Sequence, residues 1–211
     1  MAAAAERTVT AAPGTPEHGS LGPRSRITPE RETELYRAVL DLLREVGYDA
    51  LTMDAIASRT RSSKATLYRQ WKGKPQLVAT ALRRSKPVSV GELDTGSLRG
   101  DFQTLVTRLD DSRMADDSAL LRGLFHAVHS HPDLLQALRE LFIDPELTGL
   151  DALLRRAVDR GEIRADSPAL SYVPHMVIGA LIARPLVEDR PVDQAFLGHY
   201  FDSVLLPALG V

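Results

Sequence analysis

Residues 51–77 read LTMDAIASRTRSSKATLYRQWKGKPQL, and this stretch decides the fold that the sequence predicts. Thr52 and Ser63 are typical N-cap residues, and each precedes a short segment whose apolar side chains follow helical spacing. The spacing predicts helices over 52–59 and 63–71 with a tight polar turn between them. Two short helices joined in this way form a helix-turn-helix.

The second helix of the pair has two chemically different sides. Leu67 and Trp71 lie about one turn apart, so we expect both to pack against the rest of their domain. Lysine, threonine, arginine and glutamine occupy most of the remaining positions and point elsewhere. A helix that lies in the major groove of DNA needs an apolar side for its own domain and a polar side for bases and phosphates.

Charge is divided unevenly along the chain, although the formal net charge is only −2. Residues 24–86 contain fourteen basic and seven acidic residues, whereas residues 87–211 contain eleven basic and nineteen acidic ones. All four lysines lie within residues 64–86. This asymmetry indicates that the basic segment binds a polyanion such as a nucleic acid, although a solvated basic surface would give the same count.

Composition excludes several classes of protein. Hydrophobic residues make up 44% of the 211 residues and charged residues 26%, which is typical of a soluble globular protein. Cysteine is absent, which excludes disulfides, thiolate nucleophiles and cysteine-based zinc sites. The sequence has no run of about 18 apolar residues and no secretory signal pattern. We therefore expect no membrane partner and a cytoplasmic location.

Helical spacing continues on both sides of the motif. Thr28-Pro29 begins a helix that Gly47 ends, and a fourth helix begins near Lys74. Residues 87–100 show no clear helical stripe and predict a linker. Further helical segments are expected at 98–112, 117–130, 132–160, 168–188 and 192–209, with kinks or breaks at Pro145 and Pro185.

The motif closely resembles the signature of the TetR family of transcriptional regulators. The resemblance is carried by LTMDAIA (51–57) and SKATLYRQWKGKPQL (63–77), and it covers about residues 29–86. It implies an all-α fold, with an N-terminal three-helix helix-turn-helix DNA-binding domain and a C-terminal helical bundle for dimerisation and ligand binding. We therefore assign residues 1–25 to a disordered tail, 26–86 to the DNA-binding domain and 87–211 to the effector-binding and dimerisation domain.

The resemblance also implies roles for individual residues. Phosphate contacts are implied for Thr52, Tyr68 and Lys74. Base-edge contacts are expected from Lys64, Thr66 and Gln70, while Ser63 is mainly a helix cap whose hydroxyl can also reach DNA. The alternative is that Tyr68 is packing material and Gln70 a solvated surface residue. Arg24 and Arg26 are either an arm along the DNA or the charged end of the tail.

The turn of the motif departs from the family pattern. The family usually places a glycine and an apolar residue where this chain has Arg61 and Ser62. Arginine adopts a positive φ less readily than glycine, so either the turn has conventional dihedral angles or it accepts some strain. An additional DNA phosphate contact by Arg61 is a further hypothesis.

Two broad apolar stripes near the C-terminus predict a homodimer. Gly179 and Ala180 permit close helix approach, and a two-fold contact of four helices would bury the stripes. The alternative is an entirely intramolecular core. The stripe residues are Tyr172, Val173, Met176, Val177, Ile178, Leu181 and Ile182, then Phe196, Tyr200, Val204 and Leu205.

Candidates for lining an effector cavity are aromatic, methionine and histidine side chains among apolar helices. They are Phe125, His126, His129, Phe142, Tyr172, His175 and Met176. His126, His129 and His131 are close in sequence, but no carboxylates stand at matching spacing, so we expect no metal ion and no cofactor.

The sequence therefore predicts a sequence-specific DNA-binding transcriptional regulator, a repressor that a small hydrophobic effector releases from a palindromic operator. Within the same class, the alternative is a repressor or activator without an effector. From another class, the alternative is a helical enzyme. No catalytic motif supports an enzyme, and adjacent acids such as Asp110-Asp111 do not face each other on a helix.

Overall fold

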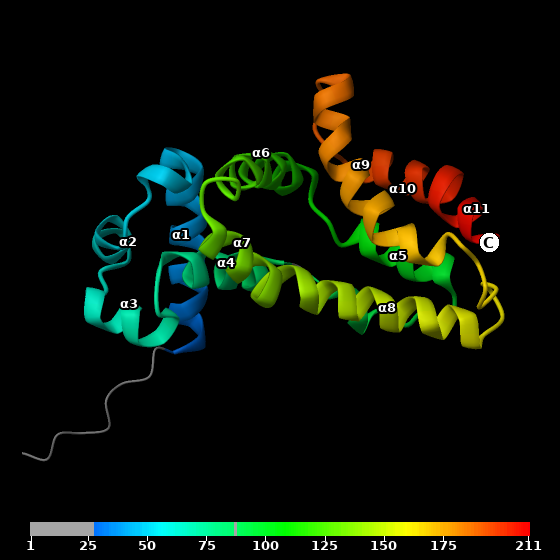
Figure 1. Ribbon diagram of the computed structural model, residues 1–211, viewed down its shortest axis with the longest axis horizontal. Coiled ribbons are helices and arrows are strands. Elements are labelled where there is room, and N and C mark those ends of the chain that lie inside the picture. The colour runs from blue at the N-terminus through cyan, green and yellow to red at the C-terminus, as the bar shows by residue number, and fades with distance from the viewer. Residues whose placement is uncertain (1–27, 87) are drawn as a thin grey trace, which may run out of the picture.

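The computed structural model of the protein describes residues 28–86 and 88–211. Within this part of the chain every regular element is a helix, so the all-α prediction is confirmed (Figure 1). The predicted tail, with Arg24 and Arg26, lies outside the described residues.

The α-helices do not follow chain order from one end of the molecule to the other, because the chain turns back midway (Figure 1). They are α1 (Pro29–Ala50), α2 (Met53–Thr60), α3 (Lys64–Trp71), α4 (Lys74–Ser85), α5 (Leu98–Thr107), α6 (Asp111–Ala127), α7 (Pro132–Leu138), α8 (Asp144–Asp159), α9 (Val173–Glu188), α10 (Gln194–Tyr200) and α11 (Leu206–Leu209). Short 3₁₀ or π-helical turns connect or continue them: η1 (Val90–Glu92), η2 (Arg139–Ile143), η3 (Leu170–Tyr172) and η4 (Phe201–Leu205).

Helix α1 begins and is interrupted where the sequence predicts. Thr28 Oγ1 accepts the Arg31 N–H at 3.3 Å, and Pro29 is the first helical residue. Gly47 has φ 74°, a left-handed conformation that glycine adopts without steric cost, and a last irregular turn continues to Ala50.

Thr52 and Ser63 both cap their helices as expected. Thr52 Oγ1 accepts the Ala55 N–H at 3.1 Å, and Ser63 Oγ accepts the Thr66 N–H at 3.1 Å. The hydroxyls of Ser63 and Thr66 also lie 2.8 Å apart. The predicted helices of the motif are therefore present as α2 and α3.

A first hydrophobic core lies between α1, α2, α3 and α4. Val39, Ile56, Leu67 and Leu77 are completely buried in it. The same core extends to α6 and α7, which contribute Leu120, Leu124, Ala127, Leu134, Ala137 and Leu138. The helix-turn-helix and its supporting helices are therefore packed directly against helices that follow residue 87. Because close-packed cores transmit displacement, a shift of α6 or α7 is felt by α1 and α4.

A second core joins α5 and α8 to α9–α11 and includes part of the predicted linker. Val88 and Leu93 are buried there. Gly91 and Gly149 bring their backbones together so closely that a Cβ on Gly91 would lie 2.9 Å from the Gly149 Cα. The segment after α4 is thus a packed connection, which the absence of a helical stripe did not reveal.

Helix boundaries in the C-terminal half differ from the predicted ones in one region. Helix α5 ends at Thr107, and α6 begins at Asp111 and not at 117. The reason is a cap: Asp110 Oδ1 accepts the Arg113 N–H at 3.0 Å. The predicted segment 132–160 is continuous through α7, η2 and α8, and Pro145 lies just after the π-helical turn.

One helical stretch in the described residues, Leu170–Glu188, is long and apolar enough to span a membrane by length and composition. The sequence prediction counted only uninterrupted apolar residues, and this stretch contains His175 and the buried Arg184. Arg184 pairs with Asp193 at 3.0 Å and lies over the Phe196 ring, which is a protein-packed environment. Only 17% of the residues in this apolar window are fully buried, and Ile178, Leu186 and Val187 are exposed in the single chain.

Candidate nucleic-acid interface and cavity

Helix α3 lies at the edge of the molecule and has the two sides that the sequence predicts (Figure 1). Leu67 and Trp71 are buried, and the Trp71 ring packs edge-on against Tyr36 with ring centroids 5.8 Å apart. Lys64 is exposed, and 48% of the Tyr68 surface is accessible. The polar side of α3 is therefore open to a large partner.

Two of the expected base-reading side chains, Lys64 and Gln70, pair with acidic side chains of other helices. Lys64 Nζ lies 2.5 Å from Asp54 Oδ1, and hydrogen bonding to this carboxylate raises the pKa of the lysine. Gln70 Nε2 donates to Glu32 Oε1 at 2.6 Å. All four side chains belong to surface contacts, and surface pairs contribute little to stability. Bases and phosphates can therefore replace these partners at small cost.

Lys74 has a structural role that the sequence did not indicate. Its ammonium donates to the Tyr48 carbonyl at 2.9 Å and lies 4.0 Å from the centroid of the Tyr48 ring. Burial lowers the pKa of Lys74 and raises the pKa of the Tyr48 hydroxyl. The lysine thus holds the end of α1 against the start of α4, the position from which a phosphate contact is expected.

The sequence left two alternatives for the turn between α2 and α3, conventional dihedral angles or a strained positive φ, and the structure has the strained one. Arg61 has φ 50° and ψ 40°, in the left-handed region. Its N–H donates to the Ser58 carbonyl at 3.3 Å, and the Ser62 N–H donates to the Ala57 carbonyl at 3.0 Å. These bonds close the end of α2 in the way that glycine usually permits.

Arg61→Gly is expected to raise the free energy of unfolding by about 0.5–1 kcal/mol, because glycine removes the cost of a left-handed residue with a Cβ. Urea denaturation followed by circular dichroism measures this change. Arg61→Ala is the matched control: it removes the same charge but keeps a Cβ at positive φ, so no gain is expected. Equal stability of the two variants would show that the turn is unstrained.

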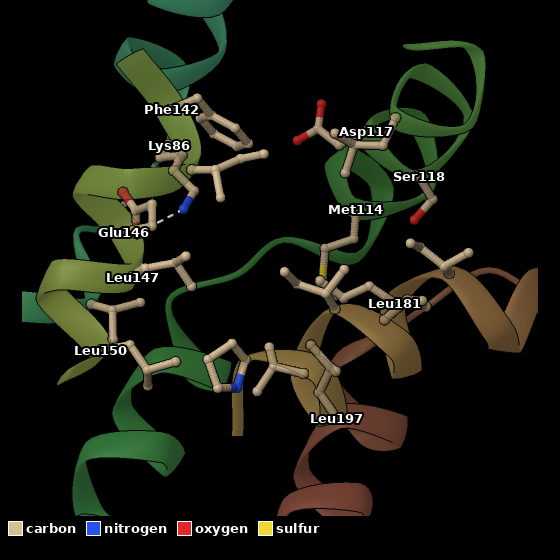
Figure 2. A pocket seen from close by; sticks show the side chains of 18 of the residues that line it. Lys86, Met114, Asp117, Ser118, Phe142, Glu146, Leu147, Leu150, Leu181 and Leu197 are labelled. Carbon is tan, nitrogen blue, oxygen red and sulfur yellow. Dashed lines mark ion pairs between the residues drawn. The ribbon is translucent and has the colours of Figure 1, made fainter. Parts of the chain in front are cut away.

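A cavity of about 390 Å³ lies between α6, α8 and α9, beside the segment that follows α4. Apolar side chains line most of it, among them Met114, Leu147, Leu181 and Leu197 (Figure 2). The volume is within the range of small-molecule sites.

Two of the seven predicted lining residues, Phe125 and Phe142, line this cavity. The other five, His126, His129, Tyr172, His175 and Met176, are not part of the lining of this cavity, and a ligand contact by them stays a prediction. The three histidines and Tyr172 are exposed, since they lie on the outer faces of their helices, and Met176 packs against the second core. Residue type alone identifies amphipathic candidates but does not define which helix face the cavity meets.

The polar residues of the cavity lining were missed. They are Lys86, Asp117, Ser118, Arg122 and Glu146. Asp117 Oδ1 is already paired with Arg44 at 2.7 Å. Lys86 pairs with Glu146 across the cavity wall at 2.8 Å (Figure 2). The one available sequence signal was the place of Lys86 at the end of the lysine-rich segment. Among the described residues no three histidine or acidic side chains are grouped as a metal site.

These features define a class of protein. A short two-sided helix belongs to a helix-turn-helix in the basic part of a chain whose described elements are all helices, and an apolar cavity lies in the other half. The molecule is a DNA-binding transcriptional regulator of the helix-turn-helix type.

Comparison with known proteins identifies the family. Residues 35–81 match the model for bacterial regulatory proteins of the tetR family, and residues 92–204 match the tetracyclin repressor-like C-terminal domain. An HTH-type transcriptional regulator of Mycobacterium tuberculosis (strain ATCC 25618 / H37Rv) is 38% identical over 85% of this chain and 88% of its own length. The DNA-binding transcriptional repressor TetR of Mycobacteroides abscessus is 34% identical over 83% and 92%.

A crystal structure of a TetR family transcription regulator superimposes with a TM-score of 0.65 and 28% identity. The match covers 85% of this chain and 98% of that one. The chain belongs to the TetR family, and the resemblance read from its helix-turn-helix is confirmed.

Proposed function

We propose that the protein is a homodimeric repressor that leaves a palindromic operator when a small apolar effector occupies the cavity. The cavity carries this proposal, because it borders Lys86 at the end of α4, and α4 packs on α1 and α7. A molecule in the cavity thus lies next to the connection with the DNA-binding helices. The Mycobacteroides abscessus relative is named a repressor, which favours repression over activation.

Release from DNA follows from a population shift. A ligand changes operator affinity only if it binds better to a conformation in which the two recognition helices are wrongly spaced for DNA. The shared core of α1, α4, α6 and α7 is the physical route by which occupancy of the cavity would favour that conformation.

Contacts with DNA are assigned to the exposed side of the helix-turn-helix. Lys64, Thr66 and Gln70 would meet base edges, and Thr52, Tyr68 and Lys74 would meet phosphates. Ser63 caps α3 beside them, and Arg61 projects from the turn as a further phosphate ligand. The exposure of Tyr68 and the surface position of Lys64 support these roles.

The uncovered surface of α9 and the C-terminal helices supports a homodimer. Ile178, Leu186, Val187 and Val204 are large apolar side chains that the single chain leaves exposed. Val173 and Leu205, by contrast, belong to the internal core. A second copy that covers the exposed set explains why an apolar helix is so little buried.

We propose no catalytic activity, since the reported relatives are named as regulators of transcription. A DNA-binding regulator acts in the cytoplasm, and we retain that location. We also retain the division at residue 87 between the DNA-binding and the effector-binding and dimerisation domains, with the qualification that their helices share a core.

Selection of bound sites from random duplex DNA tests the proposal, and a palindromic consensus is expected. Gln70→Ala should change base preference and weaken binding to the consensus by about 1–3 kcal/mol. Tyr68→Phe removes only a phosphate contact, so it should weaken binding equally for every DNA sequence and leave base preference unchanged. Tyr68 is a better probe than Lys74, whose removal also disturbs Tyr48.

Arg155→Ala on α8 is the matched control, as this exposed side chain lies far from α3 in sequence and contacts Asp151 of its own helix. Its binding should equal that of the original protein. Failure of the pure protein to select any duplex at low salt would contradict the assignment of α3 as the reading helix.

A further inference from the structure

One end of the cavity holds a cation that belongs to the protein itself. Lys86 Nζ lies 2.8 Å from Glu146 Oε2 and 5.1 Å from the centroid of the Phe142 ring. Figure 2 shows these three side chains together at the α8 side of the cavity. A carboxylate beside an aromatic face is an arrangement that attracts a positive charge.

The carboxylate at this end is incompletely satisfied. Glu146 Oε2 is fully buried and accepts no hydrogen bond, because Lys86 approaches at ion-pair distance without the alignment of a hydrogen bond. A buried charge that lacks a well-aligned donor is unfavourable. An N–H donor that approached from inside the cavity would improve its environment.

Lys86 is the more exposed member of the pair. It stands just after the last residue of α4, in extended backbone, and 32% of its side chain is accessible to solvent. Glu146 lies in the first turn of α8 with 19% of its side chain accessible. The lysine can move its ammonium into water on a flexible stem, whereas Glu146 stays at the cavity wall.

The rest of the lining sets the shape of the partner. Beyond this pair the wall seen in Figure 2 is largely aliphatic, with Met114, Leu150 and Leu181 from three different helices. Asp117, the other acid of the lining, is held by Arg44. Both acids of the lining are therefore paired within the chain, and Glu146 differs from Asp117 in that its Oε2 is buried without an aligned hydrogen bond, next to an extended apolar surface.

We propose that the effector is a lipophilic monocation whose ammonium replaces that of Lys86 against Glu146 and the Phe142 ring. This inference rests on the proposed function of the cavity as an effector site. Displacement of Lys86 also removes the ion pair that ties the end of α4 to α8. The same binding event thereby frees the connection to the DNA-binding helices.

The test uses three decyl compounds that differ only in the head group: decylammonium, decanoate and 1-decanol. Isothermal titration below micelle-forming concentrations measures their affinities for the full chain. Decylammonium should bind at least about tenfold more tightly than the other two, the difference expected for one charge-assisted hydrogen bond. Equal binding of all three, or tightest binding of decanoate, would overturn the proposal.

Two variants separate the partners of the ion pair. Glu146→Gln should weaken decylammonium about tenfold and leave decanol unchanged. Lys86→Met should strengthen decylammonium about tenfold, because the internal competitor is gone and the carboxylate lacks a counter-charge. Asp151→Asn, an exposed acid on the same helix, is the control and should change nothing. Unchanged decylammonium affinity in Glu146→Gln, or no gain in Lys86→Met, contradicts the displacement of Lys86.

Operator release is measured separately, by fluorescence anisotropy of labelled DNA. If the three affinities follow the predicted order but no compound releases DNA, the cation site is supported and the proposed effector role of the cavity is contradicted. If decanoate or decanol releases DNA as effectively as decylammonium, effector control of DNA binding is supported and the proposal of a cationic effector is contradicted.

Discussion

Trp71→Ala is expected to lower the free energy of unfolding by about 3–5 kcal/mol, the range typical of a buried tryptophan truncated to alanine. Trp71 ends the recognition helix, is 5% exposed and packs edge-on against Tyr36 of α1. Its loss opens a cavity between α1 and α3 and removes an aromatic contact. Operator binding should fall with the folded fraction, because α3 loses the support that fixes its position.

Denaturation by urea measures this effect and must be followed by circular dichroism, since Trp71 is the single tryptophan of the chain. Trp71→Phe is the control: it keeps an aromatic ring against Tyr36 and should recover most of the stability. A loss below about 1 kcal/mol for Trp71→Ala would mean that α3 is not anchored by this side chain.

Leu186→Glu is expected to lower the association constant of the proposed dimer at least about a thousandfold. An uncompensated charge buried at an interface costs several kcal/mol, and a two-fold axis introduces the substitution twice. Leu186 is 72% exposed in the single chain and does not line the cavity, so the fold and the effector site should be preserved. A monomer cannot place two recognition helices about one DNA turn apart, so binding to a palindrome should weaken strongly.

Analytical ultracentrifugation measures the association constant, and anisotropy of labelled DNA measures operator binding. Ala152→Glu is the matched control, because it adds the same charge at an exposed position of α8. It should leave both quantities unchanged. A dimer of unaltered strength in Leu186→Glu would show that the α9 surface has another use.

The DNA-binding half was predictable because its signals are local. The caps at Thr52 and Ser63 and the spacing of Leu67 and Trp71 define α2 and α3 through contacts within a few residues. The sequence did not determine the backbone of the turn at Arg61, for which conventional dihedral angles and a strained positive φ were both possible. The structure has the strained one, since the backbone must reverse between α2 and α3 whatever side chain is present.

The cavity was predicted less well. Phe125 and Phe142 were identified by type and helical context, whereas the predicted histidines are exposed and lie outside the lining of this cavity. The early start of α6 at Asp111 contributes, because it brings Met114, which precedes the predicted helix, into the lining. An apolar stripe that is broad enough to contact both the protein's own core and a second copy does not indicate which of its residues contact which surface.

By itself, the sequence determined the helical class, the helix-turn-helix and the side of α3 that faces away from the core, because caps and apolar periodicity act over one or two turns. The tertiary structure alone decided that Lys86 meets Glu146, sixty residues later in the chain, and that few residues of α9 are fully buried. These facts depend on how α4, α6, α8 and α9 pack, and packing is a property of the assembled core that no local pattern encodes.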